Sequence, residues 1–578
     1  MYNQRMKKRL KAPWLKFYGW RKKTLRYSNL SMYKMLVSSS KKWKNETAFD
    51  YFGTKITWKK FISKVDRAAR AMSAFGVEKG TVVTIISPNT PEAVMAIYAA
   101  NKLGAIANVV HPLSSEADMK HAVDLTGSRI VFIIDVAYPT LAKILPTTDI
   151  EYIIVMSPKD SMSGIIKLGY QVTAGRKVAH IPSRTGQYSF WEFMWKSHGV
   201  QENVGVRSKG GDDPAVILYS GGTTGTPKGI LLTNKAFNAY ILQCPEFVST
   251  IRPGKTILGI LPIFHGFGLS LGVHLPLCLG ITNVMLPKFD AASFHKTLDK
   301  HKPEIIIGVP TLYEAMLKNK KIRKMDMSFL ETPVCGGDVL TNKLKDEVDG
   351  MLAKAGCKAE ILRGYGLTEF LAGACFVPPE RMKLGSIGIP IQDVHVKVVE
   401  PNTDIELKTG EMGELVITGP NMMQGYLNEE EETNRTLVLH GDGHVWLHTG
   451  DLCHVDEEGY IFYDQRLKRL IISSGYNVYP ARIEEVINGV DEVLLVTVVG
   501  IPDPYRGQVA RAFVVLKDGV KPSGGLKRKI MAQCKTNLPK YSLPWEIVFR
   551  KALPKTRLNK VAYRELEEDT GGDDTETE

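Results

Sequence analysis

The sequence predicts an α/β protein with a large N-terminal domain of stacked α/β sheets and a small α+β C-terminal domain. Its 578 residues exceed what one hydrophobic core usually supports, so at least two domains are expected. From residue 80, short β-rich runs alternate with runs of helical spacing, which is typical of a largely parallel sheet covered by helices. Near residue 465 a basic, turn-rich stretch separates this pattern from a final region of mixed strand and helix.

The alternation is clearest over residues 81–135. There "TVVTIIS", "AIANVV" and "RIVFIID" are β-rich, whereas "PEAVMAIYAANKLG", closed by Gly104, and "SEADMKHAVDLTG" have helical spacing. The pattern resumes further along with "TILGIL", "NVMLP", a helix near 291–301, "EIIIGVP" and a helix from Thr311. Residues 157–194 lack clear periodicity and are expected to leave the sheet.

Charge is distributed unevenly along the chain, whose formal net charge is +14. Residues 1–44 form a basic arm with fourteen Lys and Arg and no acid, and residues 565–578 form an acidic tail that we expect to be disordered. Between them we expect the large domain over 45–465 and the small domain over 466–564, with a hinge near 466–468.

The basic arm leaves two alternatives open. From Pro13, a favourable first helical residue, Trp14, Phe17, Tyr18 and Leu25 would fall roughly on one face of a short basic helix. Such a helix could lie on an anionic membrane surface as a peripheral attachment, or the arm could dock on its own protein. Nucleic acid is not an expected partner, because no recognised binding motif accompanies the charge.

Composition excludes several classes of protein. With 44% hydrophobic and 24% charged residues, the chain is typical of a globular protein. The seven cysteines are scattered singly, which argues against a zinc site and a disulfide framework, and no apolar run is long enough to span a bilayer. The basic N-terminus lacks the apolar stretch of a secretory signal, so a reducing cytoplasm is the expected compartment.

The stretch "YSGGTTGTPKG" (219–229) follows an apolar run and is too polar to build a core. Its glycines would let backbone N–H groups close around a phosphate, and its hydroxyls add donors. It departs from the G-x-x-x-x-G-K-[ST] pattern, because two residues separate Gly225 from Lys228. A flexible turn is the alternative. The candidate phosphate-binding residues are Ser220, Gly221, Gly222, Thr223, Thr224, Gly225, Thr226 and Lys228.

Four further polar clusters follow this loop. They are "RGYGLTEF" (363–370), "LHTGDL" (447–452), "YDQRLKRL" (463–470) and "LPKTRLNKVAYREL" (553–566). Each alone could be a turn or a capped helix start, since Thr-Glu is a common first-turn pair and a lone terminal lysine is usually solvated.

Taken together, in this order and spacing, these clusters closely resemble the adenylate-forming superfamily, which includes acyl-CoA synthetases, peptide-synthetase adenylation domains and luciferases. The resemblance extends over residues 45–566 and is strongest to bacterial medium- and long-chain acyl-CoA synthetases. It also includes "LPIFHGFGL" (261–269), "VPTLYEAM" (309–316), "CGGDVL" (335–340), "GELVITGPNMMQGYLN" (413–428) and "SSGYNVYP" (473–480).

The resemblance implies a reaction in which a carboxylate attacks the α-phosphorus of ATP, giving an acyl-adenylate and pyrophosphate. The glycine-rich loop would hold the β- and γ-phosphates, and Lys560 would bridge the attacking carboxylate and the α-phosphate. The other implied roles are Mg²⁺ coordination by Glu369, a bond from Thr368 to the α-phosphate, adenine stacking on Tyr365 beside Gly366, a base-pocket wall at Gly336 and Gly337, and ribose contacts from Asp451 and Arg466.

The resemblance also implies a second step, in which a mobile C-terminal domain rotates about Lys468 and CoA attacks the adenylate. Gly475 would then line the pantetheine tunnel, and His265 would gate the site. Two departures from the family pattern stand out. Gly221–Gly222 replaces a more usual hydroxyl-containing pair, and Asn559 replaces the usual glycine before Lys560, where a small effect is expected because Asn tolerates left-handed backbone.

The substrate is the least determined feature. "FHGFGLSLGVHLPLCLG" (264–280) is apolar enough to line a hydrocarbon slot, but a buried core helix would have the same pattern. We expect a medium- or long-chain fatty acid, with ATP and CoA as partners, and keep an aryl or bile-type acid, a separate carrier protein as acceptor, and a luciferase as alternatives. A catalytically silent nucleotide-binding scaffold is disfavoured, because all the expected catalytic residue types are present.

Overall fold

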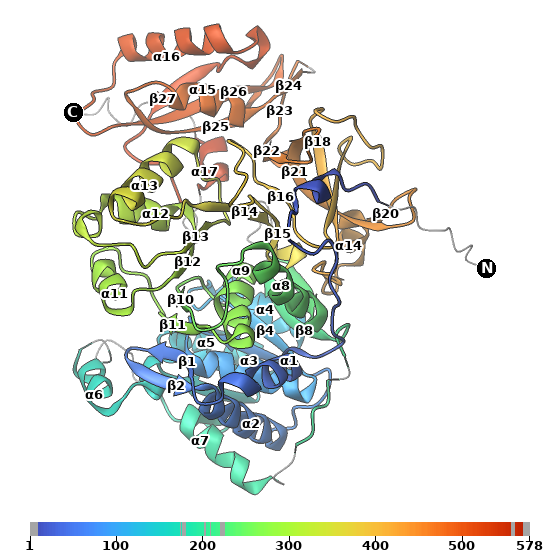
Figure 1. Ribbon diagram of the computed structural model, residues 1–578, viewed down its shortest axis with the longest axis vertical. Helices are drawn as coiled ribbons and strands as arrows, with labels where there is room; N and C mark the ends of the chain where they lie inside the picture. Colours follow the sequence, from blue (N-terminus) through green and yellow to red (C-terminus); the bar gives the residue numbers. More distant parts are fainter. Residues whose placement is uncertain are drawn as a thin grey trace.

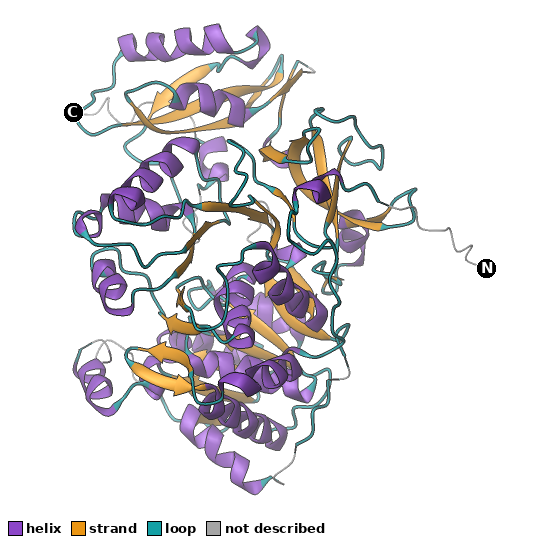
Figure 2. Ribbon diagram, viewed as in Figure 1, coloured by secondary structure: helices purple, strands orange, loops and turns teal. Residues whose placement is uncertain are grey.

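The computed structural model describes residues 10–173, 175, 181–200, 204–208, 210–219, 226–474, 476–555 and 561–569. Two large sheets and their helices make up most of the molecule, a smaller antiparallel sheet flanks them, and a C-terminal sheet lies at one end (Figures 1 and 2). The mixed α/β architecture predicted from the sequence is confirmed.

The first large sheet has the strand order β19-β9-β8-β4-β3-β5-β6-β7 and is parallel from β8 to β7. Its strands are β3 (Val82–Ile86), β4 (Ile106–Val110), β5 (Ile130–Ile134), β6 (Tyr152–Met156), β7 (Gln187–Ser189), β8 (Pro214–Tyr219), β9 (Gly229–Thr233) and β19 (Gly425–Tyr426). The associated helices are α1 (Met32–Ser39), α2 (Trp58–Ala74), α3 (Pro91–Leu103), α4 (Glu116–Thr126), α5 (Tyr138–Ile144), α6 (Gly164–Val172) and α7 (Phe190–Trp195).

The second large sheet has the order β16-β15-β14-β13-β12-β10-β11-β1-β2. Its strands are β1 (Thr47–Tyr51), β2 (Thr54–Thr57), β10 (Thr256–Gly259), β11 (Thr282–Met285), β12 (Ile305–Gly308), β13 (Thr332–Cys335), β14 (Leu362–Gly366), β15 (Gly373–Phe376) and β16 (Ile389–Pro390). Its helices are α8 (Asn234–Phe247), α9 (Gly266–Leu269), the π-helical turn η8 (Ser270–His274), α10 (Leu275–Leu279), α11 (Phe294–His301), α12 (Pro310–Lys318) and α13 (Asn342–Lys354).

The chain leaves the first of the two smaller sheets at Arg466 and then enters the second. The flanking antiparallel sheet contains β17 (His395–Val399), β18 (Gly413–Thr418), β20 (Leu437–Leu439), β21 (Val445–Val455) and β22 (Ile461–Arg466), with helix α14 (Glu430–Thr436). The C-terminal sheet contains β23 (Ile471–Ser473), β24 (Tyr476–Val478), β25 (Val493–Asp503), β26 (Gly507–Leu516) and β27 (Glu546–Phe549), with helices α15 (Pro480–Asn488), α16 (Gly524–Asn537) and α17 (Tyr563–Glu567).

Local sequence signals explain why these elements begin and end where they do. The Thr90 hydroxyl accepts from the backbone N–H of Ala93 at the start of α3, and Gly104 ends that helix with φ +72°. Strands β3 to β5 are apolar on both faces because helices cover both sides of a parallel sheet. The β-rich and helical runs predicted over residues 81–135 are therefore confirmed.

The acidic tail begins later than the sequence suggested. Helix α17 continues to Glu567, and the Asp569 carboxylate accepts from Arg550 at 2.8 and 2.9 Å. Residues 565–569 thus belong to the fold, because the half-buried side chains of Arg550 and Arg511 bind Asp569. The rest of the predicted tail lies outside the described residues.

The N-terminal arm docks on its own protein. The helix that starts at Pro13 is a 3₁₀-helix ending at Phe17, and the longer amphipathic helix expected to reach Leu25 does not form, because Gly19 adopts φ +56°. Trp14 and Tyr18 are buried instead of facing outward. The arm therefore uses Trp14 and Tyr18 for intramolecular packing.

Polar contacts fasten the same segment. The Tyr18 hydroxyl donates to the carbonyl of Pro390 at 2.8 Å, and Arg21 donates to the carbonyl of Phe247 at 2.8 Å. Arg21, whose side chain is only 3% exposed, also pairs with Glu380 at 2.7 Å. These contacts tie α8 to the segment that leads into the flanking sheet.

Two kinds of feature are absent from the described residues. No helix in the described part of the chain is long and apolar enough to cross a membrane. No group of three or more His, Cys, Asp or Glu in that part is arranged to hold a metal ion. The seven cysteines are all buried and none is in a disulfide.

Replacing Arg21 with Ala should destabilise the large domain. The variant loses a half-buried ion pair and a hydrogen bond to a buried carbonyl, and hydrogen bonds of charged groups contribute about 1.5–3 kcal/mol. We expect a thermal unfolding midpoint a few degrees lower in differential scanning calorimetry, consistent with a change of roughly 2 kcal/mol in a long chain. Lys22→Ala is the matched control, since that side chain is 70% exposed. Equal midpoints for both variants would contradict an anchoring role for the arm.

Candidate active site

A buried carboxylate, Asp451, forms the centre of the candidate site. Strand β21 pairs with β22 so that Asp451 lies opposite Arg466, and their Oδ1 and Nε atoms are 3.0 Å apart. The Tyr365 hydroxyl, from β14, donates to Asp451 Oδ2 at 2.6 Å. Three residues that the sequence predicted to bind one nucleotide are thus brought together from three strands in two sheets.

The other carboxylate oxygen of Asp451, Oδ1, accepts no hydrogen bond in the described structure. Arg466 lies within ion-pair distance of Oδ1, but its N–H is not aligned for a hydrogen bond, so the buried Oδ1 accepts none. Burial raises the pKa of Asp451, and the charge of Arg466 and the hydrogen bond from Tyr365 act against that rise. An orphaned buried acceptor is suited to a ligand hydroxyl, such as one on a ribose.

The bulge in β21 just before Asp451 is held by its own hydrogen bonds. The backbone N–H of Asp451 donates to the Thr449 hydroxyl at 3.1 Å, and Gly450, with φ +66°, donates its N–H to Glu414 at 3.0 Å. The same Glu414 carboxylate pairs with His448 at 2.9 Å. Glycine is suited to position 450 because the backbone φ there lies in the left-handed region.

Thr368 and Glu369 lie in a 3₁₀ turn directly after β14. The Tyr426 hydroxyl, from β19, donates to Glu369 Oε1 at 3.1 Å. Leu371, which follows this turn, is buried and has φ +65°, an uncommon conformation for a leucine. The strained backbone fixes the direction in which the Thr368–Glu369 turn leaves the sheet.

His265 lies at the N-cap position of α9, immediately before Gly266. A Cβ atom at Gly266 would overlap the carbonyl oxygen of Leu371, so only glycine permits the approach of these two backbones. The half-buried His265 ring contacts the ring of Phe264, with centroids 4.9 Å apart. The histidine predicted to gate the site therefore lies next to the turn that carries Glu369.

The predicted base-pocket wall is also part of this region. A Cβ at Gly336 would lie 3.2 Å from the carbonyl oxygen of Gly364 and 3.3 Å from the ring of Phe267. Gly337 has φ +77° and faces Val309 and Phe267. The turn after β13 therefore packs its backbone directly against β14 and α9.

Only the end of the glycine-rich loop falls within the described residues. Residues 220–225 lie outside them, so the predicted phosphate contacts of Ser220, Gly221, Gly222, Thr223, Thr224 and Gly225 stay predictions. Thr226 is exposed. Lys228 forms an ion pair with Glu432 on α14, and its Nζ lies 5.2 Å from the centroid of the Tyr426 ring.

The proposed hinge follows Arg466 in the chain. Lys468 is exposed in the 3₁₀ turn Leu467–Arg469, between the flanking and C-terminal sheets. Gly475, Asn559 and Lys560 lie outside the described residues. Tyr563, three residues after Lys560, packs under the guanidinium of Arg469 at 4.4 Å, and burial raises its pKa while the charge of Arg469 acts against that rise.

Sequence reasoning missed two residues of this region, Tyr426 and Glu432. Tyr426 belongs to a motif that was recognised, but nothing in the motif indicates that its hydroxyl contacts Glu369. Glu432 is one of four consecutive glutamates, so its sequence context gives no signal. Its pKa is lowered first by the hydrogen bond with Lys228, and further by the charges of Arg435 and Lys468.

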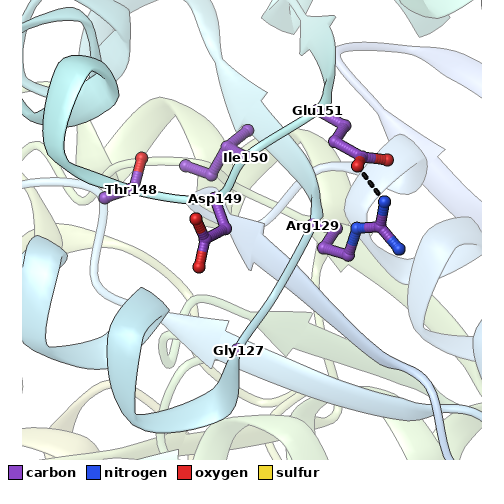
Figure 3. Close-up of a pocket in the computed structure, with 6 residues that line it drawn as sticks. All are labelled: Gly127, Arg129, Thr148, Asp149, Ile150 and Glu151. Carbon is purple, nitrogen blue, oxygen red and sulfur yellow. Dashed lines mark hydrogen bonds and ion pairs between the residues drawn. The ribbon is translucent and has the colours of Figure 1, made fainter.

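One surface pocket lies apart from these residues. It is lined by Gly127, Arg129, Thr148, Asp149, Ile150 and Glu151, and an Arg129–Glu151 ion pair crosses one side of it (Figure 3). The pocket residues precede β5 and β6, so the pocket lies at the amino ends of the parallel strands. The glycine-rich loop follows β8 and therefore leaves the sheet at the carboxyl ends. Ligands of such sheets bind at the carboxyl ends of the strands.

The chain matches known proteins over most of its length. A family model described as AMP-binding enzyme matches residues 36–427, and one described as AMP-binding enzyme C-terminal domain matches residues 482–560. The chain therefore belongs to the AMP-binding enzyme family, as the motifs predicted. A long-chain-fatty-acid–CoA ligase from Bacillus subtilis (strain 168) is 30% identical over 546 residues, which cover 94% of this chain and 95% of that protein.

Solved structures agree on the fold. ATP-bound MatB from Rhodopseudomonas palustris is similar with a TM-score of 0.80 at 23% identity, covering 93% of this chain and 98% of that one. A benzoate CoA ligase from Burkholderia xenovorans LB400 gives a TM-score of 0.77 at 23% identity, covering 93% and 100%. The large N-terminal domain and the smaller C-terminal domain predicted from the sequence are thus confirmed.

Asp451→Asn should weaken AMP binding by about tenfold to a hundredfold. The amide replaces one acceptor oxygen and removes the charge, and a hydrogen bond to a charged group contributes about 1.5–3 kcal/mol. Isothermal titration of AMP into the protein measures the change. Glu457→Gln makes the same charge change at an exposed position a few residues away and should bind AMP like the unmodified protein. Unchanged affinity in Asp451→Asn would remove Asp451 from the nucleotide site.

Proposed function

We propose that the protein is an ATP-dependent acyl-CoA synthetase. It activates a medium- or long-chain fatty acid as an acyl-adenylate and then transfers the acyl group to CoA, giving acyl-CoA, AMP and pyrophosphate. The observation that carries the proposal is the buried Asp451 oxygen without a hydrogen bond, held beside Tyr365 and Arg466 in a chain of the AMP-binding family.

In the first step the attacking group is a carboxylate, so no general base is required. The difficulty is to bring two anions together and to stabilise the phosphoryl transition state, which demands fixed positive charge and hydrogen-bond donors. In the proposed mechanism Thr368 donates to the α-phosphate and Asp451 accepts from the ribose. Lys228 and the loop before it would hold the departing pyrophosphate, and Lys560 would bridge the two reacting groups.

Glu369 is the proposed protein ligand of Mg²⁺. Its carboxylate receives one hydrogen bond, from Tyr426, in the described structure, which leaves oxygen lone pairs for a hard cation. A bound Mg²⁺ would neutralise phosphate charge. Tyr426 would orient the carboxylate toward it, in the way that outer hydrogen bonds commonly orient metal ligands.

In the second step the C-terminal domain is proposed to rotate about Lys468. This motion would carry Lys560 away and bring Gly475 to a pantetheine tunnel, with His265 at its entrance.

The fatty-acid assignment draws support from the Bacillus subtilis relative and from the apolar segment 264–280. Most of that segment is buried, as the core-helix alternative predicted. Gly272, in the π-helical turn, is an exception to close packing: outside its own helix, an added Cβ would find no atom nearer than the Leu261 carbonyl oxygen at 4.0 Å. π-Helical turns are frequent at functional sites, and this gap offers room for hydrocarbon.

An aryl acid is the second candidate, because the benzoate CoA ligase shares the fold. A bile-type acid and a carrier-protein acceptor are further alternatives, which a screen of pyrophosphate release with different acids, with and without CoA, separates. We further propose a reducing, cytoplasmic location, which the seven unpaired cysteines support, with peripheral attachment to a membrane.

A pyrophosphate-release screen across acids, with and without CoA, tests the assignment. Activity should rise from short to long acyl chains, and CoA should be consumed in step with the acid. Better turnover of acetate or benzoate than of C8–C16 acids would contradict the fatty-acid proposal. Release of pyrophosphate without thioester would point to another acceptor.

Within that screen, Gly272→Leu should lower kcat/KM for a C16 acid relative to a C8 acid by about tenfold. The added side chain would displace roughly two methylenes, each contributing about 0.8 kcal/mol when buried. Gly272→Ala is the control and should keep the ratio, because its methyl group meets no close neighbour. Parallel losses for both acids in Gly272→Leu would place the acyl chain elsewhere.

Single-turnover kinetics of each half-reaction tests the two-orientation mechanism. Lys560→Ala should slow adenylate formation by roughly 10²–10³, the loss seen when a preorganised transition-state contact is removed. The same variant should form acyl-CoA from a supplied acyl-adenylate at nearly the original rate. Gly475→Leu should behave in the opposite way. Equal damage to both steps in Lys560→Ala would leave that lysine with a structural role only.

A further inference from the structure

Helix α6 (Gly164–Val172) turns its apolar side chains away from the protein. Ile165 is 89% exposed, Leu168 62% and Val172 49%, and no residue of the helix is buried. Spacings of three and four residues place these three side chains on one face. A surface helix normally directs such a stripe at the core, so α6 has the reverse arrangement.

Hydrogen bonds fix the segment that leads into α6. The backbone N–H of Ser163 donates to the Thr54 hydroxyl of β2 at 2.9 Å, and the Tyr51 hydroxyl of β1 donates to the carbonyl of Pro158 at 3.1 Å. Just before α6, the Ser161 hydroxyl donates to the buried Glu92. Figure 1 shows α6 at the edge of the molecule, beside β1 and β2.

The β1–β2 turn adds a further apolar residue next to α6. Phe52 in that turn is 41% exposed, and a Cβ at the following Gly53 would lie 3.9 Å from Ile166 Cδ1. Exposed apolar side chains from two separate elements therefore adjoin. Contiguous exposed apolar surface of this kind marks interaction sites.

The charge around this face is basic. Lys300 on α11 has its Nζ 3.5 Å from the same Gly53 Cβ position, Lys167 lies on α6 itself, and Lys55 lies on β2. Residues 161–191 contain four Lys or Arg and no acid. Of the acids nearby, Asp50 is buried and pairs with His301 at 3.6 Å, and Asp160 accepts from the Ser157 backbone at 2.8 Å.

We propose that α6 and Phe52 dock the protein on an anionic lipid surface. An interfacial helix inserts its apolar face into the lipid while basic side chains meet anionic headgroups, and α6 with its surroundings supplies both parts. In the described part of the N-terminal arm, Trp14 and Tyr18 are buried in the fold, so these two side chains do not face a lipid surface. This inference goes beyond the proposed reaction and does not depend on the substrate.

A second copy of the chain is a less suitable occupant. A symmetric dimer through this face would bring the same patch of both copies together. The lysines Lys55, Lys167 and Lys300 of both copies would then be gathered in one interface, and like charges oppose association. An anionic surface instead complements these three lysines.

The test is sedimentation of the full chain with vesicles of phosphatidylcholine alone or mixed with phosphatidylglycerol. The intact protein should bind the anionic vesicles, more weakly as salt rises. The double variant Ile165→Ser/Leu168→Ser should partition at least about tenfold less, because burying each side chain contributes substantially to binding. Leu439→Ser, which changes an equally exposed leucine on β20, should bind like the intact protein.

Insertion is measured directly with the variant Leu168→Trp, in which the fluorescence of the introduced indole should shift to the blue and be quenched by brominated lipid. Circular dichroism and turnover of a soluble C8 acid should be the same in the double Ser variant as in the intact protein. Equal vesicle binding by the double Ser variant, or no quenching in Leu168→Trp, would overturn the proposal. A dimer seen by analytical ultracentrifugation and lost in the double Ser variant would assign the face to self-association instead.

Discussion

The close approach of two backbones, at Gly266 and Leu371, is the constraint on which the candidate site depends. No side chain fits at Gly266, and Leu371 holds an uncommon positive φ so that its carbonyl can point there. This contact joins the start of α9 to the turn that follows β14. It places His265 beside the turn that carries Thr368 and Glu369. The strain at Leu371 is tolerated because the residue is fully buried and packed.

Much of this arrangement could be predicted from sequence, for a physical reason. Strands buried on both faces, such as Val82–Ile86 and Ile130–Ile134, produce continuous apolar runs, and their helices carry Thr caps and terminal glycines. Tyr365, Asp451 and Arg466 stand in recognisable motifs, and the structure brings them together as expected. Local pattern and long-range position agree at these residues.

The residues that sequence reasoning missed depend on strand pairing between distant segments. Tyr426 reaches Glu369 and Lys228 because β19 pairs with β9, with Tyr426 opposite Ile230. Nothing local to either segment indicates that register. The N-terminal arm shows the same limit, since its aromatic spacing fits a membrane helix as well as a docked strap. The burial of Trp14 and Tyr18 against the rest of the protein favours the docked strap for these residues.

The pairing of β21 with β22 has a consequence for how the two halves of the protein share one ligand. Arg466 is both the last residue of the flanking sheet and a partner of Asp451, so strand pairing and charge fix it from two directions. The connection to the next sheet begins only one residue later, at Leu467. A rotation of the C-terminal domain about residues beyond Arg466 would therefore leave the contacts of a ligand with Asp451 and Arg466 unchanged. Only contacts made by the C-terminal domain itself, such as the one proposed for Lys560, would be gained or lost in that rotation.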